Sequence, residues 1–361
     1  MKAVILVGGE GTRLRPLTCS ISKAMVPILN RPFMEHLVTY LSKHNVTDII
    51  LAMGYLPDTI QSYLGDGSLF GVKLAYLVEG SPLGTAGAVK NADTFLDDTF
   101  IVLNGDILTE IDLTEMIRQH QAAKPKVSIA LTPVDNPTIY GVVETDDKGM
   151  VKRFVEKPSW GKVTTNMINA GMYILEPDIL TYISPETKSM FEYDVFPLML
   201  EKGDPILSYA SDAYWIDIGT PEKYLKANHD LLVQQGRENI TIAGEGQVHP
   251  SVKIEGPVII GEGCIIAEGV EIKGPTVLGE RCQIGKNAIL EGVMAWNEAR
   301  IGEKSLLRNC IICSYSTVQE NSRVLDNCVI GDGTTVTKDS VLSEGDRIWL
   351  NNYDKGSEKP N

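Results

Sequence analysis

The sequence has few cysteines and a shortage of positive charge. Its six cysteines in 361 residues are too few for a disulfide scaffold. Lysine and arginine number 33 against 47 aspartates and glutamates, for a formal net charge of -14. Because nucleic acids and anionic lipid surfaces attract positive charge, this balance argues against both as partners. A site that binds an anion must therefore concentrate its basic residues locally.

Long apolar runs are also missing. The first one, residues 3–7, stops at Gly8 and Gly9 and is too short for a secretory signal or a membrane span. We therefore expect a cytoplasmic protein with no membrane partner. The hydrophobic fraction of 43% is still ample for a large core, and the length suits two domains.

Up to about residue 236, short apolar runs alternate with amphipathic stretches. Strands are expected at 3–7, 48–53, 72–78, 100–103, 127–131 and 170–175, and helices at 32–43, 85–95 and 113–123. This alternation predicts an α/β fold with a mostly parallel sheet and helices on both faces. A last helix is expected from Thr220, its N-cap, and Pro221 to Gly236.

A different period begins after residue 236. Small or apolar residues recur every six positions from Val252 through Val258 and Cys264, each with an isoleucine two residues later. Neither a helix nor a simple strand has this period, so it predicts a parallel β-helix of roughly five coils of about 18 residues. The register slips by one residue around 294–300. The expected boundaries are a first domain at 1–236, a linker at 237–247, the β-helix at 248–345 and a tail at 346–361.

The spacing of the cysteines follows the coils. Cys264 and Cys282 are one coil apart, as are Cys310 and Cys328, so each pair is expected to stack as packed free thiols. Cys310 and Cys313 have the spacing of a metal-ligand pair, but no second pair accompanies them. No metal is predicted in the β-helix.

The first strand leads into a glycine-rich loop that runs from Gly8 to Arg15. Glycines allow the backbone to approach phosphate oxygens closely, and Arg13, Arg15 and Lys23 give the loop a local positive excess. The loop matches neither the Walker pattern nor GxGxxG, since Leu14 occupies the third glycine position. Taken alone, it is either a phosphate site or a structural turn with solvated arginines.

Further motifs in the sequence decide between these two interpretations of the loop. After GGEGTRLRPLT and Lys23 the chain has PLGTAG at 82–87, LNGD at 103–106, YG at 140–141, FVEKP at 154–158, NAG at 169–171 and WIDIGTP at 215–221. In these motifs and their order, residues 1–235 resemble the sugar-1-phosphate nucleotidyltransferases, the nucleotide-sugar pyrophosphorylases. The resemblance implies a Rossmann-like nucleotide-diphospho-sugar transferase fold for the catalytic domain at 1–236. It also implies a left-handed β-helix of hexapeptide repeats, which is common in this family.

The resemblance implies four catalytic residues, namely Arg13, Lys23, Asp106 and Asp217. In such enzymes a sugar phosphate oxygen attacks the α-phosphorus of a nucleoside triphosphate and pyrophosphate leaves, so catalysis depends on positioning and charge neutralisation. Arg13 would bind the β and γ phosphates, and Lys23 would bridge the triphosphate and the sugar phosphate. The family usually flanks this lysine with prolines, whereas Ser22 and Ala24 stand here, which predicts a less rigid loop.

Asp106 and Asp217 each follow a predicted strand, where open α/β sheets bind ligands. A single aspartate there is more often a cap or turn residue. Both, however, lie in motifs that the family uses for Mg²⁺, and carboxylate oxygens suit that ion. The resemblance therefore implies Mg²⁺ as the cofactor, held by these two residues.

The remaining contacts are implied residue by residue. The nucleotide-binding set is Leu6, Gly8, Gly9, Gly11, Thr12, Arg13, Glu79, Pro82, Gly84, Thr85, Gly87 and Asp106. The sugar-phosphate set is Lys23, Tyr140, Gly141, Glu156, Lys157, Asn169 and Gly171. Lys157 would hold the phosphate and Glu156 the sugar hydroxyls, and Asn104 is interpreted as a turn residue.

Residues 79–87 resemble the loop of mannose-1-phosphate guanylyltransferases, which implies GTP and mannose 1-phosphate as substrates and GDP-mannose as product. A glucose-1-phosphate thymidylyl- or uridylyltransferase is the alternative within the family. A non-catalytic subunit that senses nucleotide sugars is an alternative of another class. Acyl transfer by the β-helix would need a histidine, and none occurs from Val252 onward. A homo-oligomer formed through the β-helix is expected.

Overall fold

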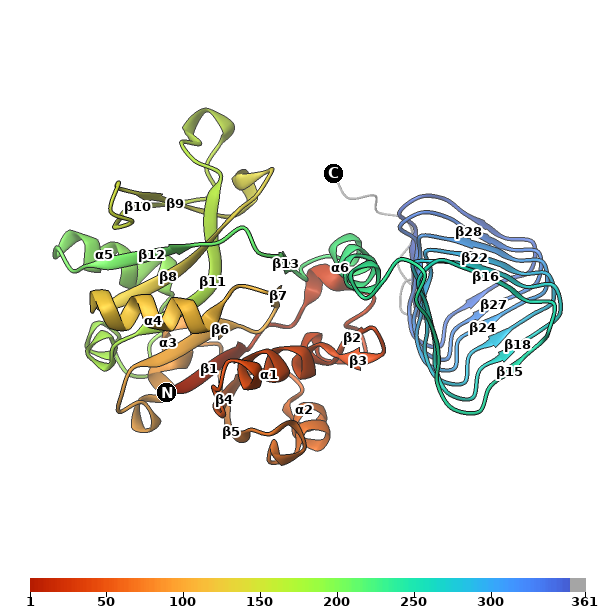
Figure 1. Ribbon diagram of the computed structural model, residues 1–361, viewed down its shortest axis with the longest axis horizontal. Helices are drawn as coiled ribbons and strands as arrows, with labels where there is room; N and C mark the ends of the chain where they lie inside the picture. Colours follow the sequence, from red (N-terminus) through yellow and green to blue (C-terminus); the bar gives the residue numbers. More distant parts are fainter. Residues whose placement is uncertain (351–361) are drawn as a thin grey trace. The chain divides into compact units, whose positions relative to one another are not determined.

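The computed structural model describes residues 1–350, so the predicted tail lies outside the described residues from position 351 on. Contacts divide the chain into two compact units (Figure 1). Unit 1 contains residues 1–10 and 34–217, and unit 2 contains residues 11–33 and the chain from 218 onward. The glycine-rich loop therefore groups mostly with the C-terminal part of the chain, which the predicted boundary at 236 did not anticipate.

Unit 1 is built on a sheet of nine strands in the order β10-β9-β11-β6-β1-β4-β5, with β8 beside β11 and β12 beside β8. The strands are β1 (Lys2–Val7), β4 (Asp48–Met53), β5 (Lys73–Val78), β6 (Phe100–Asn104), β8 (Val127–Pro133), β9 (Gly141–Thr145), β10 (Val151–Glu156), β11 (Met167–Leu175) and β12 (Ile206–Ala210). The strands β6, β1, β4 and β5 are parallel, whereas β11 is antiparallel to β6 and β8. The Rossmann-like prediction is confirmed, but the sheet is mixed, because the hairpin β9–β10 and β11 pair antiparallel.

The helices of unit 1 lie between these strands along the chain (Figure 1). They are α1 (Phe33–Lys43), α2 (Pro57–Leu64), α3 (Gly84–Asn91), α4 (Leu113–Ala123) and α5 (Phe196–Glu201). The core combines aliphatic strand residues such as Val4 and Val102 with an aromatic group of Tyr173, Phe191 and Phe196. The ring centroids in that group are 5.2–5.6 Å apart, which fixes the segment before α5 against β11.

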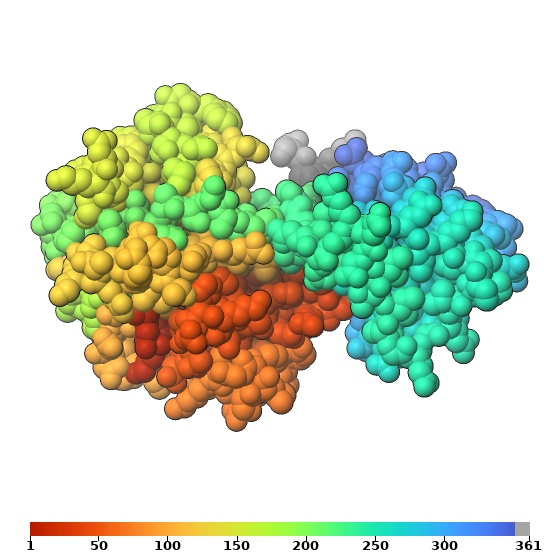
Figure 2. Space-filling view, in the orientation of Figure 1, coloured from red at the N-terminus to blue at the C-terminus, as the bar shows by residue number. Residues whose placement is uncertain are grey.

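Unit 2 contains the β-helix, seen in Figure 1 as a stack of coils and in Figure 2 as the teal-to-blue surface. Three parallel sheets form its walls. The first contains β14 (Ile240–Ile242), β17 (Val258–Ile260), β20 (Thr276–Leu278), β23 (Met294–Ala295), β26 (Ile311–Ile312), β29 (Val329–Ile330) and β32 (Arg347–Ile348). The second contains β15 (Gln247–Val248), β18 (Ile265–Ile266), β21 (Gln283–Ile284), β24 (Arg300–Ile301), β27 (Thr317–Val318) and β30 (Thr335–Val336). The third contains β16 (Lys253–Glu255), β19 (Glu271–Lys273), β22 (Ile289–Glu291), β25 (Leu306–Arg308), β28 (Arg323–Val324) and β31 (Val341–Leu342).

The prediction of a parallel β-helix is confirmed, with two differences. Sheets of seven, six and six strands make six complete coils and one further strand, more than the five expected. The strand β14 lies inside the predicted linker and β32 inside the predicted tail, so the β-helix extends past both predicted boundaries. Polar outward residues hide the repeat at its ends, because only one or two positions in each hexad must be apolar.

The coil length also varies. Residue 260 pairs with 278, a step of 18, whereas 278 pairs with 295 and 295 with 312, two steps of 17. The next step, from 312 to 330, is again 18. The single slip predicted around 294–300 is thus one of two consecutive short coils.

The interior of the β-helix is apolar and closely stacked. Inward residues such as Ile260, Leu278, Leu290 and Ile312 are fully buried. The five cysteines of the coils are free and buried, so the prediction of packed free thiols is confirmed for Cys264, Cys282, Cys310 and Cys328. Each coil therefore covers the apolar face of its neighbour, which is the basis of stability in such repeats.

Unit 2 also contains α6 (Pro221–Gln234) and a small hairpin of β2 (Pro27–Ile28) and β3 (Arg31–Pro32). The Thr220 hydroxyl accepts a hydrogen bond from the Lys223 N–H at 3.4 Å, so the predicted cap of α6 is confirmed. Within residues 1–350, no helix is both long enough and apolar enough to cross a membrane.

Candidate active site

The ends of β1 and β6 lie against each other. The Gly105 N–H donates to the Leu6 carbonyl at 2.9 Å, and a Cβ at Gly105 would lie only 2.4 Å from that oxygen. Glycine is therefore required here, because any side chain would separate the two strands. Asp106 follows directly, so its position is set by the carboxyl ends of β1 and β6.

A second small sheet brings Asp217 beside Asp106. It consists of β7 (Ile107–Thr109) and β13 (Trp215–Asp217), which pair antiparallel with Asp217 opposite Ile107. The ladder thus brings Asp217 opposite the residue that follows Asp106, although the two predicted metal ligands are far apart in the sequence. Two carboxylates in this arrangement fit a Mg²⁺ ion, which keeps several waters and phosphate oxygens among its ligands. Within residues 1–350, no group of three or more histidine, cysteine, aspartate or glutamate side chains could hold a metal by itself.

Tyr140 orients Asp217. Its hydroxyl donates to the Asp217 Oδ1 at 2.6 Å, and its ring meets the Trp215 ring edge-on at 5.7 Å. The Trp215 indole N–H in turn donates to the Ala170 carbonyl of β11 at 2.9 Å. These contacts join the Tyr140 loop, β11 and β13, all of which carry predicted site residues.

The hairpin β9–β10 brings the next sugar-side residues to this place. Gly141 pairs with Glu156, and a Cβ at Gly141 would lie 2.7 Å from the Glu156 Oε2. The Lys157 N–H donates to the Tyr140 carbonyl at 2.9 Å. The Lys157 ammonium lies 3.6 Å from the Glu156 Oε1, and its side chain is 63% exposed. Lys157 is therefore an accessible cation beside a more buried carboxylate.

A bulge in β11 holds Asn169 and Gly171. The register with β8 shifts between Asn169 and Tyr173, where Gly171 has a φ of +72°. The Asn169 Oδ1 accepts from the Gly171 N–H at 2.9 Å, and its Nδ2 donates to the Tyr173 hydroxyl at 2.7 Å. A side chain at Gly171 would collide with Asn104, because a Cβ would lie 2.5 Å from its Nδ2.

On the nucleotide side, Glu79 follows β5 and lies near the glycine loop. Its Oε2 accepts from the Leu83 N–H at 3.1 Å and would lie 4.0 Å from a Cβ at Gly8. Burial raises the pKa of Glu79, although the hydrogen bond from Leu83 opposes this. Glu79 is therefore a partly desolvated acceptor that also orders the loop leading to Pro82.

The start of α3 packs on residues 187–192. Gly84 has a φ of +74°, and a Cβ there would lie 2.5 Å from the Ser189 carbonyl, which accepts the N–H groups of residues 86 and 87. Gly87 is equally tight, since a Cβ would lie 2.8 Å from the Thr187 carbonyl. Thr85 accepts from the Phe191 N–H and donates to Glu192. Close packing thus accounts for the glycines at 84 and 87, and two hydrogen bonds account for the threonine at 85.

The other predicted phosphate-handling residues belong to unit 2. Gly11 has a φ of +65°, and a Cβ there would lie 3.0 Å from Thr18 and 3.3 Å from the Lys23 Cβ. The Thr18 hydroxyl donates to the Gly11 carbonyl at 2.8 Å. The loop therefore folds back so that Lys23 lies beside Gly11, and Arg13, two residues after Gly11 in the chain, is exposed.

Ser22 and Ala24, which replace the family's prolines, are both buried. The Ser22 hydroxyl accepts from the Ala24 N–H at 3.3 Å and caps a short 3₁₀ turn, Lys23–Met25. Local capping thus orders the backbone at Lys23 without proline.

Two residues near the site were missed in the sequence. In the described chain, the Asn104 Oδ1 is buried without a hydrogen-bond partner, and this residue lies between Gly171 and Asp106. The position of Asn104 in the LNGD motif, two residues before Asp106, was the sequence feature that could have marked it. Glu192 accepts from Thr85 and from Tyr173 at 3.2 and 2.8 Å, which links α3 to β11. No local pattern marks Glu192, since both partners are distant in the chain.

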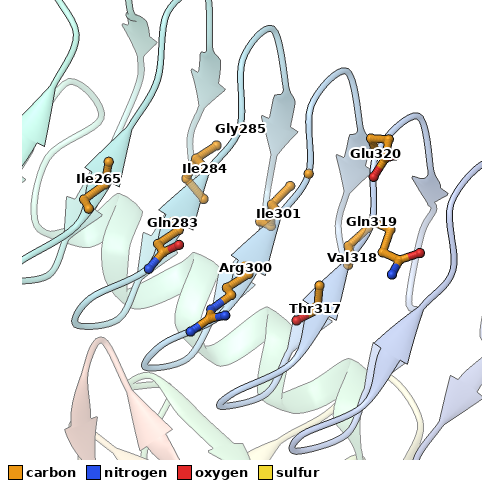
Figure 3. A pocket seen from close by; sticks show the side chains of 11 residues that line it. Ile265, Gln283, Ile284, Gly285, Arg300, Ile301, Thr317, Val318, Gln319 and Glu320 are labelled. Atoms are coloured by element: carbon orange, nitrogen blue, oxygen red, sulfur yellow. The ribbon is translucent and has the colours of Figure 1, made fainter.

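The surface of the β-helix has a separate groove of about 360 Å³. Gln283, Arg300 and Thr317 from successive coils form a row along it, and Gln319 and Glu320 lie at one side (Figure 3). None of the predicted nucleotide or sugar residues lines this groove. It is therefore a feature of the repeat surface.

Comparisons with known proteins agree with this division of the chain. Residues 2–234 match the family model described as Nucleotidyl transferase, and residues 237–342 match that of the EIF2B subunit epsilon LbH domain. The second match agrees with the predicted left-handed β-helix.

Two relatives span nearly the whole chain. A mannose-1-phosphate guanyltransferase of Kluyveromyces lactis is 38% identical over 96% of this chain and 95% of its own length. A UTP–glucose-1-phosphate uridylyltransferase of Synechocystis is 34% identical over 92% and 87%. Among solved structures, HddC of Yersinia pseudotuberculosis complexed with GMP-PN has a TM-score of 0.56 and 35% identity over 64% of this chain and 99% of that one. Motifs, fold and both matched models thus agree, and the chain belongs to the nucleotidyl transferase family, with a left-handed β-helix as its second domain.

Proposed function

We propose that this protein transfers the guanylyl group of GTP to mannose 1-phosphate, forming GDP-mannose and releasing pyrophosphate. The observation that carries the reaction type is the place of the two aspartates at strand ends. Asp217 pairs with Ile107, the residue after Asp106, and Tyr140 is bonded to Asp217. An oxygen of the sugar phosphate attacks the α-phosphorus, a bond forms there, and the bond to pyrophosphate breaks on the opposite side.

Asp106 and Asp217 would hold the Mg²⁺ ion. When bound, the ion offsets negative charge on the phosphates and orients the α-phosphate. The Tyr140 hydroxyl keeps one oxygen of Asp217 occupied, so the carboxylate presents its other oxygen in a defined direction. Removal of divalent ions with a chelator should abolish turnover, and added Mg²⁺ should restore it.

Charge on the substrates is neutralised by three cations. Arg13 binds the β and γ phosphates that leave, and Lys23 contacts both the triphosphate and the incoming phosphate. The exposed ammonium of Lys157 anchors the sugar phosphate. The Glu156 carboxylate accepts hydrogen bonds from sugar hydroxyls, and the Asn169 amide forms hydrogen bonds with them. Loss of Lys157 should raise the KM for sugar phosphate with less effect on the KM for triphosphate.

Glu79 supports guanine as the base. Guanine presents two adjacent donors, its N1–H and its 2-amino group, and a carboxylate accepts both. Uracil and thymine place a carbonyl oxygen on each side of a single N–H, and these oxygens would repel a carboxylate. Because Glu79 is partly desolvated, its hydrogen bonds to a base are strengthened. The name of the Kluyveromyces lactis relative and the GMP-PN in HddC point the same way.

The glucose-1-phosphate uridylyl- or thymidylyltransferase reaction is the second candidate, favoured by the Synechocystis relative. The decisive experiment measures pyrophosphate release with Mg²⁺ while GTP, UTP, dTTP, CTP and ATP are crossed with four sugar 1-phosphates. Strong turnover of GTP with mannose 1-phosphate alone supports the proposal. Turnover of UTP or dTTP with glucose 1-phosphate overturns the assignment of guanine as the base and mannose as the sugar. Nucleotide-sugar binding without any turnover would instead support a sensing subunit.

Glu79 can be tested within the same assay. Glu79→Gln keeps one acceptor but adds a donor, so the preference for GTP over UTP should fall at least about tenfold. Glu110→Gln, an exposed carboxylate of the same unit, is the matched control and should leave the preference unchanged. An unchanged preference in Glu79→Gln would remove this residue from the base site.

We also propose a homo-oligomer formed through the β-helix and a cytoplasmic location. The β-helix exposes apolar side chains on its outer walls, among them Ile265 and Val341, which are 45% and 62% exposed. Light scattering of the full chain tests the assembly, and a strictly monomeric mass at micromolar concentration would contradict it.

A further inference from the structure

The chain between Arg13 and Lys23 belongs to the same compact unit as the β-helix. Three of its residues contact the last coils. The Ser20 hydroxyl donates to the Asp332 carboxylate, and the Arg347 guanidinium donates to the Arg15 carbonyl at 3.3 Å. A Cβ at Gly331 would lie 3.1 Å from the Pro16 Cβ, so the backbone of the coil approaches the loop closely. These contacts join residues more than 300 positions apart.

Asp332 is itself held by its coil. Its Oδ1 accepts from the Ser314 N–H of the preceding coil at 2.8 Å, while its Oδ2 accepts from Ser20. Burial raises the pKa of Asp332, and the hydrogen bonds from Ser20 and Ser314 oppose this. The carboxylate is thus a fixed acceptor at the corner of the coil, and the loop supplies one of its two donors.

Arg347 connects three elements. One nitrogen of its guanidinium donates to the Arg15 carbonyl, and another donates to the Glu222 Oε1 of α6 at 2.8 Å. Burial would raise the pKa of Glu222, but hydrogen bonds that include those from Thr220 and Arg347 hold it below its ordinary value. The planar fork of arginine suits this double role, which a lysine could not fill in the same way.

The chain after Lys23 is attached as well. The Asn30 Nδ2 donates to the Leu278 carbonyl of β20 at 2.8 Å. The Tyr224 hydroxyl of α6 donates to the Pro27 carbonyl at 2.6 Å and accepts from the Trp296 indole at 2.9 Å. The segment that carries Lys23 is therefore held on both sides by α6 and the coils.

We propose that the β-helix positions the triphosphate-binding loop, with Asp332 and Arg347 as positioning residues that hold Arg13 and Lys23 in their working arrangement. The N–H groups of residues 14, 15, 17 and 19 close local turns inside the loop, and the contacts with Asp332 and Arg347 attach those turns to the β-helix. A loop ordered before substrate arrives avoids the entropy cost of ordering it on binding. The inference deepens the proposed function, since it assumes that this loop binds the triphosphate.

The kinetic test compares Asp332→Ala, Ser20→Ala and Arg347→Ala with wild type. Each should raise the KM for triphosphate, and kcat/KM for triphosphate should fall about tenfold, the usual effect of losing a charged hydrogen bond. Asp332→Asn keeps an acceptor for Ser20 and should recover part of the loss. Asp326→Ala is the matched control, because Asp326 bonds Arg308 and Asn309 within the coils. It should leave the KM unchanged at a comparable melting temperature.

A double variant and hydrogen exchange separate positioning from general stability. If Ser20 and Asp332 act through one bond, Ser20→Ala with Asp332→Ala should be no worse than either single change. Amides of residues 11–26 should exchange faster in Asp332→Ala than in Asp326→Ala. A wild-type KM for triphosphate in Asp332→Ala, or equal exchange in the two variants, would overturn the proposal.

The exchange measurement needs no turnover. If the wild-type protein releases no pyrophosphate with any substrate pair, the proposed function fails. Hydrogen exchange still tests whether the loop is attached to the β-helix. Faster exchange of residues 11–26 in Asp332→Ala would then support the attachment of this loop to the β-helix, and equal exchange would overturn it.

Discussion

The strand-end site of unit 1 and the β-helix of unit 2 are built from opposite kinds of contact. The site depends on single bonds between residues distant in the chain, such as Tyr140 with Asp217, 77 positions apart, and Trp215 with Ala170, 45 apart. In the β-helix the strand pairings repeat one coil later, at a step of 17 or 18 residues. A change in the site should therefore affect chemistry more than stability, and a change inside the coils should do the reverse.

The largest effect is expected at the two carboxylates proposed to hold the metal ion. Asp217→Asn should lower turnover by about 10³-fold, because a neutral amide no longer offsets the charge of a metal ion, while the melting temperature stays near that of wild type. Steady-state pyrophosphate release and thermal unfolding measure the two quantities. Asp212→Asn, an exposed neighbour in the same unit, is the control and should be fully active. A normal rate in Asp217→Asn would remove it from the metal site.

The β-helix should show the opposite response. Leu290 is completely buried between coils, so Leu290→Ala should lower the free energy of unfolding by about 3 kcal/mol. The KM values should change little. Ile289, the next residue, points outward and is 36% exposed, and Ile289→Ala should cost far less. Denaturant unfolding tests the pair, and equal losses at 289 and 290 would contradict the inward and outward assignment.

A smaller effect is expected from the residue that orients Asp217. Tyr140→Phe removes one hydrogen bond to a carboxylate and should lower kcat about tenfold while the ring contact with Trp215 remains. Tyr63→Phe is the matched control, since that hydroxyl donates to Glu35 at 2.5 Å on the surface of the same unit. If both variants have wild-type kcat, Tyr140 has no role in orienting Asp217.

The smallest change in stability is expected at the N-cap of α6, the helix that follows Asp217 and precedes the first coil in the sequence. Thr220→Ala removes the N-cap and should lower the free energy of unfolding by about 1 kcal/mol. Thr220→Ser retains the hydroxyl and should stay within a few tenths of a kcal/mol of wild type. A loss as large as that of Leu290→Ala would show that this cap supports more than one helix.

The reading of the sequence succeeded where a pattern is local. The strand at 48–53 was predicted with the observed bounds, and the cap at Thr220 was found, because both depend on neighbours within a few residues. The β9–β10 hairpin and β12 were missed. Their strands are short and interrupted by polar residues, and their pairing depends on partners elsewhere in the sheet.

The candidate site shows the same division. The candidate residues of the LNGD, FVEKP and WIDIGTP motifs could be proposed from the sequence because each motif is contiguous. Glu192 was missed, since its partners Thr85 and Tyr173 come from separate elements. Asn104 was seen but interpreted as a turn residue, and only the three-dimensional packing shows that its Oδ1, within the described chain, is buried without a partner.

By itself, the sequence determined the two kinds of domain, the six-residue period of the coils and the motifs of the family, because each is a property of neighbouring residues. The tertiary structure alone decided that Asp217 pairs with Ile107, the residue after Asp106, across β7 and β13, and that the loop of Arg13 and Lys23 is tied to the last coils. No spacing in the chain encodes these pairs. They form only when packing of the whole chain brings distant polar groups within hydrogen-bond distance.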